Sequence, residues 1–196
     1  MLLRKKTVQL RDEVEFDEVY VVAGHKGQPD KVQKKGRQGR RRRLKGQRGR
    51  GTAANEKPPI LGMIQRGGEV ILRMLDNVQQ QTIQPLIQTH VARGTQVYTD
   101  EYNIYSRLTE WGYHHQTVNH SLGEYARDED GDGFHEIHVN TMEGVWSLLR
   151  SWLRPHRGIS QEKLPLYLGF FEFIHNARLR GKAVLSALLA VLIAAP

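Results

Sequence analysis

The sequence predicts an α/β domain built on a mixed sheet whose first three strands are antiparallel. Three observations lead to this class. A length of 196 residues suits one domain that buries a real core. Segments with strand patterns come first along the chain, and helical and strand patterns then alternate. No cysteine occurs, so disulfides and thiolate zinc sites are excluded, and the composition fits an intracellular protein.

The first predicted strands form an antiparallel meander. VEFDEVYVV, residues 14–22, alternates between apolar and polar positions and then becomes continuously apolar, as a strand buried at one end does. PPILGMIQRGGEVILRMLD, residues 58–76, contains two further strands joined at Gly67 and Gly68, which are typical of a hairpin turn.

Helices and strands alternate in the rest of the chain. Residues 78–94 have apolar positions at helical spacing and close at Gly94, and Pro85 is expected to kink this helix or to mark its first turn. The remaining predicted elements are, in order, a strand at 95–100, a helix at 101–111, a strand at 113–118, a polar loop at 119–135, a helix at 138–150 and a helix with a large aromatic face at 163–181.

Positive charge is concentrated in one segment of this basic chain, whose formal net charge is +8. Residues 31–50 are almost all Lys, Arg, Gly and Gln without an acid, so they cannot form a core. We interpret residues 26–56 as a flexible basic insertion that binds nucleic acid, although an unspecific solvated loop or a localisation signal has the same composition. The residues expected to contact DNA phosphates are Lys34, Lys35, Arg37, Arg40, Arg41, Arg42, Arg43, Lys45, Arg48 and Arg50.

The two ends of the chain are expected to lie outside the folded domain. The first residues contain no apolar stretch of signal-peptide length, which favours a cytoplasmic protein. The apolar stretch near the other end has fourteen residues, which is short for a membrane span. We therefore expect an N-terminal arm at 1–12, a domain at 13–181, an apolar tail at 182–196 and no membrane partner.

Three acids stand at corresponding places of the predicted elements. Asp17 lies in the first strand, Asp100 ends the fourth, and Glu143 lies in the first turns of the helix after the fifth. Each has a structural alternative. Asp17 could belong to the polar face of its strand, Asp100 could cap the following helix, and Glu143 could form a capping box with Asn140.

A meander followed by alternating helices and strands is the order of the ribonuclease H-like fold, in which the first and fourth strands are neighbours. The chain also resembles the DDE transposases of bacterial and archaeal insertion sequences, through VEFDEVYVV, VYTDEYNIY, HVNTMEGVWSLLRSWLRPHRGIS and FFEFIHNARLRG. The third of these segments is the longest and most specific match. The resemblance covers residues 13–181 and implies a five-stranded mixed sheet with flanking helices.

The resemblance also implies a site. Asp17 and Asp100 correspond to the two aspartates of the metal-binding triad, and Glu143 corresponds to its glutamate. Arg150 corresponds to the basic residue that the family commonly places seven positions after the glutamate, where it would hold a DNA phosphate. Asn140, near the helix start, is expected to support the site.

The implied reaction depends on two Mg²⁺ or Mn²⁺ ions held by carboxylates. It is hydrolysis at a transposon end, which exposes a 3′ hydroxyl, followed by attack of that hydroxyl on target DNA. The implied partners are transposon-end and target duplexes, bound by two or more copies of the chain. The alternatives are a non-catalytic DNA-binding remnant and a ribonuclease H-like nuclease. Relatives usually carry a zinc-ribbon or helix-turn-helix region before the catalytic domain, whereas sixteen residues precede Asp17 here.

A second motif suggests a calcium site. Asp128, Asp130, Asp132 and Gly133 occupy positions 1, 3, 5 and 6 of an EF-hand loop. Position 12, which requires a bidentate Glu, is Val139. We therefore interpret this stretch as a polar loop, with weak cation binding left open.

Several histidines could suggest zinc. They have no tight ligand spacing and no cysteines beside them, so strand and loop positions are expected instead. His138, two positions before Asn140, is the one expected to face the site. The set is His114, His115, His120, His135 and His138.

Overall fold

The computed structural model describes residues 8–34, 51–54, 56–118, 126–128, 133 and 136–181. Its central sheet has the strand order β4-β3-β1-β5-β6. β1, β3 and β4 are antiparallel neighbours, whereas β5 runs parallel to both β1 and β6. This arrangement confirms the predicted ribonuclease H-like fold. The strands are β1 Glu13–Tyr20, β3 Pro59–Gln65, β4 Val70–Met74, β5 Gln96–Asp100 and β6 His114–Val118.

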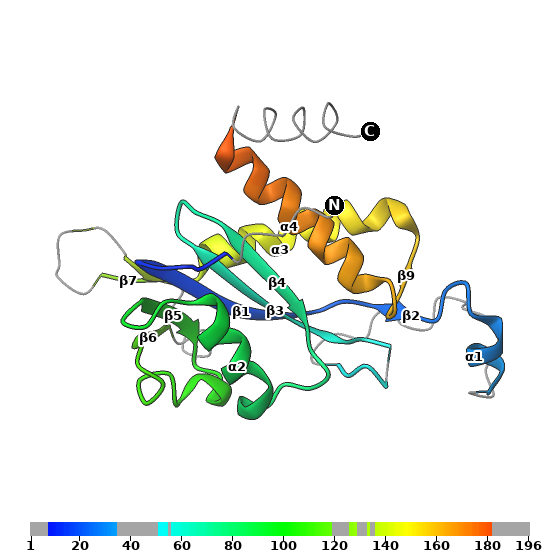
Figure 1. Cartoon of the computed structure of the whole chain (residues 1–196), viewed down its shortest axis with the longest axis horizontal. Helices are drawn as coiled ribbons and strands as arrows, with labels where there is room; N and C mark the ends of the chain where they lie inside the picture. The colour runs from blue at the N-terminus through cyan, green and yellow to red at the C-terminus, as the bar shows by residue number, and fades with distance from the viewer. Residues whose placement is uncertain are drawn as a thin grey trace, which may run out of the picture.

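Helices cover both faces of the sheet (Figure 1). One face packs against α2, and the other packs against α3 and α4. These helices are α2 Gln80–His90, α3 Asn140–Leu153 and α4 Leu164–Arg180. The shorter elements are β2 Ala23–Gly24, α1 Pro29–Lys34, η1 Asn103–Tyr105, β7 Ala126–Arg127, β8 Ile137–His138, η3 Arg154–His156 and β9 Ile159–Ser160.

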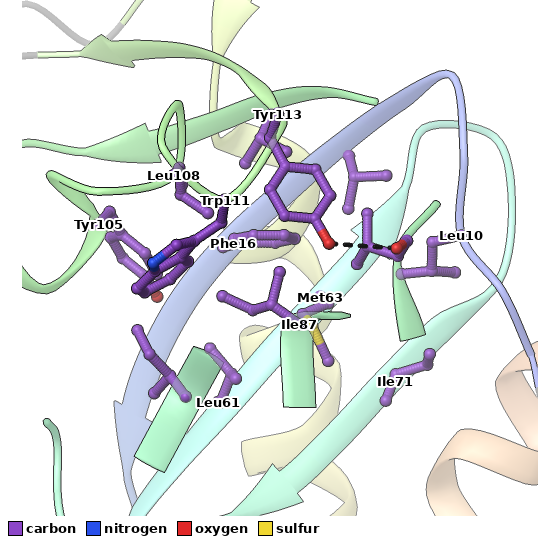
Figure 2. Close-up of a cluster of buried hydrophobic side chains, with 14 of the residues drawn as sticks. Leu10, Phe16, Leu61, Met63, Ile71, Ile87, Tyr105, Leu108, Trp111 and Tyr113 are labelled. Atoms are coloured by element: carbon purple, nitrogen blue, oxygen red, sulfur yellow. Dashed lines mark hydrogen bonds between the residues drawn. The ribbon is translucent and has the colours of Figure 1, made fainter. Parts of the chain in front are cut away.

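The apolar cluster on the α2 face is shown in Figure 2. Phe16 and Met63 of the sheet pack with Ile87 of α2, and each fully buried side chain of this kind contributes roughly 1.5–3 kcal/mol. The Tyr113 hydroxyl donates to the carbonyl of Val91 over 3.2 Å. Leu10, in the stretch expected as an N-terminal arm, is also buried in this cluster, and its backbone bonds to the end of α2.

The cluster on the opposite face depends on a glycine. Gly62 of β3 stands opposite Asp17 of β1, and Trp146 and Met142 of α3 lie over it. A Cβ atom at Gly62 would meet the indole of Trp146 at 2.5 Å and the Met142 methyl at 2.4 Å. The missing side chain therefore allows α3 to approach the sheet at this point.

A buried ion pair anchors the start of α3. Glu15 of β1 is fully buried, and its carboxylate accepts from the Thr141 hydroxyl over 2.8 Å and from the Met142 backbone N–H over 2.9 Å. Arg66 donates to the same carboxylate over 2.9 Å, and its guanidinium lies 3.9 Å from the Tyr98 ring centroid. Arg66 also donates to two backbone carbonyls just before the helix. We call this arrangement the Glu15–Arg66 clamp.

The capping-box interpretation of Asn140 and Glu143 is wrong. The N-cap residue is Val139, and its side chain makes no capping hydrogen bond. A free N–H of the first turn bonds instead to Glu15, a carboxylate from a distant strand, which the positive end of the helix dipole also stabilises.

The helix predicted at 101–111 is also wrong. Only η1 forms, followed by turns in which Leu108 and Trp111 donate to carbonyls three residues earlier. Both side chains are nevertheless buried. An apolar spacing of three residues fits such tight turns as well as an α-helix, so the pattern could not separate them. Pro85 lies inside α2 rather than in its first turn.

The basic insertion is not a loop throughout, because α1 occupies Pro29–Lys34 with no buried residue and an exposed Lys34 at its end. The predicted tail at 182–196 lies outside the described residues. Of the residues named in the calcium-loop and histidine predictions, four also lie outside them, namely His120, Asp130, Asp132 and His135. The same holds for nine of the predicted DNA contacts, namely Lys35, Arg37, Arg40, Arg41, Arg42, Arg43, Lys45, Arg48 and Arg50. Among the helices that are described, none is long and apolar enough to span a membrane.

Replacing Glu15 with Gln should destabilise the domain by about 3 kcal/mol, because it leaves the Arg66 charge beside a neutral amide in a buried site. The matched control is Glu13→Gln. Glu13 lies 3.7 Å from the same guanidinium but its side chain is 47% exposed, so the change should cost below about 1 kcal/mol. Urea denaturation of both variants measures the difference. Equal losses would show that the clamp does not stabilise the fold.

Candidate functional site

Two of the predicted acids lie on neighbouring parallel strands. The paired register of β1 and β5 ends with Glu15 opposite Tyr98, and Asp17 and Asp100 each follow two residues later on their strands. Glu143 lies in the first turn of α3, and α3 packs against the sheet face toward which the Asp17 side chain points. The charges of Asp100 and Glu143 both act on Asp17 and raise its pKa. The fold therefore brings these three acids to one end of β1 and β5.

The acids are not yet assembled into one closed ligand set. Within the described part of the chain, no three side chains of His, Asp or Glu are grouped closely enough to hold a metal ion. Their chemistry still fits Mg²⁺ or Mn²⁺, which prefer oxygen donors.

Asp17 is the most constrained of the three acids. Its Oδ2 atom accepts from the Trp146 indole N–H over 2.8 Å, and its Oδ1 atom accepts from the Glu18 backbone N–H over 2.7 Å. Burial is the largest effect on its pKa and raises it to about 6, although both hydrogen bonds act in the opposite direction. Asp17 is thus a carboxylate whose two oxygens are both oriented and whose charge is costly without a cation.

Sequence reasoning assigned no role to Trp146. Its ring occupies the space above Gly62, and only the indole N–H reaches across to the strand that carries Asp17. The available signal was its position three residues after Glu143, which places both side chains on one side of α3.

Asp100 and Glu143 are less restrained. Asp100 ends β5, and its Oδ1 atom accepts from the backbone N–H of Tyr102 over 3.1 Å. Asp100 does not cap a helix, because the N-cap residue of η1 is Tyr102 and η1 has no side-chain cap. Glu143 is exposed, and its carboxylate forms no hydrogen bond with any residue that the structure describes. Both acids can therefore turn an oxygen toward a cation near Asp17.

Arg150 lies on α3 seven residues after Glu143 and is exposed. It lines a shallow pocket of about 280 Å³ that is also lined by Tyr20, three residues beyond Asp17. Arg150 therefore lies on the helix that carries Glu143, near the end of the strand that carries Asp17.

The supporting residues lie at the start of α3. Asn140 is exposed in its first turn. His138 has its Nδ1 atom 3.2 Å from a Glu15 carboxylate oxygen, so it belongs to the Glu15–Arg66 clamp. Burial first, and then the Arg66 charge, lower the pKa of His138. His114 and His115 lie on β6, the edge strand beyond β5.

Two proteins are similar to this chain in sequence. A protein from Halobacterium salinarum, described as an uncharacterized protein in transposable element ISH50, is 36% identical over 183 residues, which are 92% of this chain and 58% of that protein. An uncharacterized transposase-like protein from Haemophilus influenzae is 28% identical over 103 residues, or 53% of this chain and 77% of that protein. The chain thus spans little more than half the length of the first relative.

Among solved structures, the HTLV-2 integrase catalytic core domain in complex with magnesium (trimeric form) aligns with 86% of each chain, at 11% identity and a TM-score of 0.41. A likeness at this level transfers no function. The match that decides the family is the ISXO2-like transposase domain, which extends over residues 9–176. The chain therefore belongs to the ISXO2-like transposase domain family.

Proposed function

We propose that this chain is the catalytic domain of an insertion-sequence transposase, which cuts DNA at transposon ends and joins the freed end to target DNA in the cytoplasm. The observation that carries the proposal is the convergence of Asp17, Asp100 and Glu143 from two parallel strands and a packed helix, with the ionisation of Asp17 linked to the other two acids. Membership of a transposase family supports the same reaction class.

The three carboxylates would hold two divalent ions, with Mg²⁺ or Mn²⁺ as the candidates. When bound, such ions supply activation of the attacking oxygen and stabilisation of the leaving oxygen. The contribution of the chain is to orient the carboxylates. Asp17 is held by Trp146 and by a backbone N–H, whereas Asp100 and Glu143 have freedom to adjust. A cation would also relieve the cost of ionising Asp17 in its buried position.

DNA would be held by positively charged side chains. Arg150, in the last turn of α3, would bind a phosphate, a contact that its guanidinium suits. The segment at 31–50 would add contacts without sequence preference, because Lys and Arg on phosphates carry no base information. Two or more copies of the chain would assemble on the DNA.

Glu143→Gln should abolish cleavage while leaving stability nearly unchanged. Glu143 is exposed and is not a cap, so its loss should alter the free energy of unfolding by less than about 0.5 kcal/mol. Cleavage of labelled transposon-end duplexes in Mg²⁺ should fall at least about 100-fold, because a neutral amide is a poor ligand for the ion.

The matched control is Glu110→Gln, an exposed acid that pairs with Arg107 on the surface. It should leave cleavage unchanged. Calorimetric titration with Mn²⁺ gives a second measurement, in which only Glu143→Gln should weaken binding. Full cleavage by an otherwise active Glu143→Gln enzyme would exclude this acid from the triad. Single-strand nicks without joined products would indicate a nuclease rather than a transposase.

Stability should depend on pH through Asp17. Its pKa is about 6 in the folded state against an ordinary value of 3.8, so the folded state favours the protonated acid. The resulting stability is present below pH 4 and is lost as the pH rises through 6. Between pH 4 and 8, metal-free wild type should therefore lose up to about 3 kcal/mol relative to Asp17→Asn. Urea denaturation in EDTA across this range measures it, and parallel curves for the two proteins would contradict the prediction.

Binding to duplex DNA should be strongly sensitive to salt. If about six to ten phosphates are neutralised, affinity should drop by roughly 10³ to 10⁵ between 50 and 200 mM salt. Replacing the four consecutive arginines at 40–43 with Gln should flatten this dependence, whereas Glu143→Gln should not alter it. Fluorescence anisotropy with a random-sequence duplex is the measurement. An unchanged salt slope after the arginine replacement would mean that the main DNA contact lies elsewhere.

A further inference from the structure

The hydrogen-bond ladder between β1 and β5 stops short of the acids. Its last pair is Glu15 and Tyr98, so Asp17 and Asp100 lie beyond the ladder on their strands. At these positions, Asp17 is paired with β3 and Asp100 is paired with β6. The ladder therefore does not fix the separation of the two backbones that carry these acids, and this separation depends on other contacts.

One side-chain hydrogen bond links the two segments beyond the ladder. The Tyr105 hydroxyl in η1 donates to the carboxylate of Glu18 in β1. Glu18 directly follows Asp17, and η1 begins three residues after Asp100. Side chains alternate along a strand, so Glu18 lies on the α2 face with Phe16, whereas Asp17 points toward α3. Glu18 is thus a link between β1 and η1 rather than a fourth acid beside Asp17.

Tyr105 is held in place by its own surroundings. It is fully buried, and its ring lies 6.0 Å from that of Phe16 in the cluster of Figure 2. Gln80 of α2 donates to the carbonyl of Asn103 and to the hydroxyl of Ser106, over 3.2 and 3.1 Å, at the two ends of η1. Tyr105 is therefore anchored independently of its bond to β1.

The Tyr105 hydroxyl also lies within electrostatic reach of the acids. Burial has the largest effect and raises its pKa, the charge of Glu18 comes next, and the charges of Asp17 and Asp100 act in the same direction. On the other side of η1, the Oδ1 atom of Asp100 accepts from the Tyr102 backbone N–H over 3.1 Å. The turn that contains η1 is therefore bonded both to Asp100 and to the residue that follows Asp17.

We propose that the Glu18–Tyr105 hydrogen bond is a positioning contact for the metal site, which sets how far apart the backbones that carry Asp17 and Asp100 lie. Without this bond, part of the binding energy of the cation would be used to bring the two carboxylates to the required spacing, so metal affinity would fall. This inference rests on the proposed function, and it adds to it two positioning residues that are not metal ligands.

Tyr113 separates this role from the ordinary need of a buried hydroxyl for an acceptor. It belongs to the same apolar cluster as Tyr105, and its hydroxyl donates to the backbone carbonyl of Val91, at the end of α2. Removing either hydroxyl leaves an acceptor without its bond and costs stability. Tyr113→Phe is therefore the matched control for Tyr105→Phe.

The test is calorimetric titration of the DNA-free chain with Mn²⁺, beside thermal melts. Tyr105→Phe should weaken Mn²⁺ binding about tenfold, the lower end of the range for groups that orient metal ligands. Tyr113→Phe should leave Mn²⁺ binding unchanged, although both variants should lower the melting temperature by roughly 2–4 °C. In cleavage of transposon-end duplexes, Tyr105→Phe should raise the Mn²⁺ concentration for half-maximal rate by the same factor and alter the rate at saturating Mn²⁺ much less.

Substitutions of Glu18 give a second measurement. Glu18→Gln keeps an oxygen that can accept from Tyr105, so it should retain more Mn²⁺ affinity than Glu18→Ala. Combining Glu18→Ala with Tyr105→Phe should add no further loss, because both remove the same bond.

Equal Mn²⁺ affinities of the two Glu18 variants, or of the Tyr105 and Tyr113 variants, would overturn the inference. If wild type binds Mn²⁺ and cleaves transposon ends in that case, the proposed function stands. If wild type neither binds Mn²⁺ nor cleaves DNA, the proposed function and this inference fail together.

Discussion

The position of α3 depends on one buried carboxylate. Glu15 is inaccessible to solvent, and its carboxylate accepts from Arg66 and from two donors at the helix start. A buried charge without partners would cost several kcal/mol, so the strand, the β3–β4 hairpin that carries Arg66 and the helix must come together as a unit. Arg66 adds two bonds to backbone carbonyls before α3. Because Glu143 and Arg150 both belong to α3, the contacts of Glu15 also fix where these two residues lie relative to β1.

A second constraint acts two residues further along β1. Burial, and to a smaller extent the charges of Asp100 and Glu143, raise the pKa of Asp17 and make its charge unfavourable. Trp146 offsets part of this cost with one N–H, and Gly62 provides the space that its ring needs. The domain thus retains a destabilising acid where burial and like charges converge, which is a frequent property of metal and catalytic sites.

Most of the sheet could be predicted because its signals are local. Alternating apolar residues, the Gly67–Gly68 turn and the short strand ending at Asp100 correspond to strands and a hairpin in the structure. The helix predicted at 101–111 did not form, because the apolar spacing did not specify the backbone geometry. Apolar side chains three residues apart can be buried by a helix or by successive turns, and tertiary packing decides between them.

The sequence by itself determined the order of the five main strands and of α2, α3 and α4, and the positions of Asp17, Asp100, Glu143 and Arg150 along them. Only the tertiary structure decided that Glu15 caps α3 and that Trp146 binds Asp17. These partners are 126 to 129 residues apart along the chain. Local propensity and periodicity describe neighbours within a few residues, whereas a buried charge selects its partners among all groups that the folded chain brings within hydrogen-bonding distance.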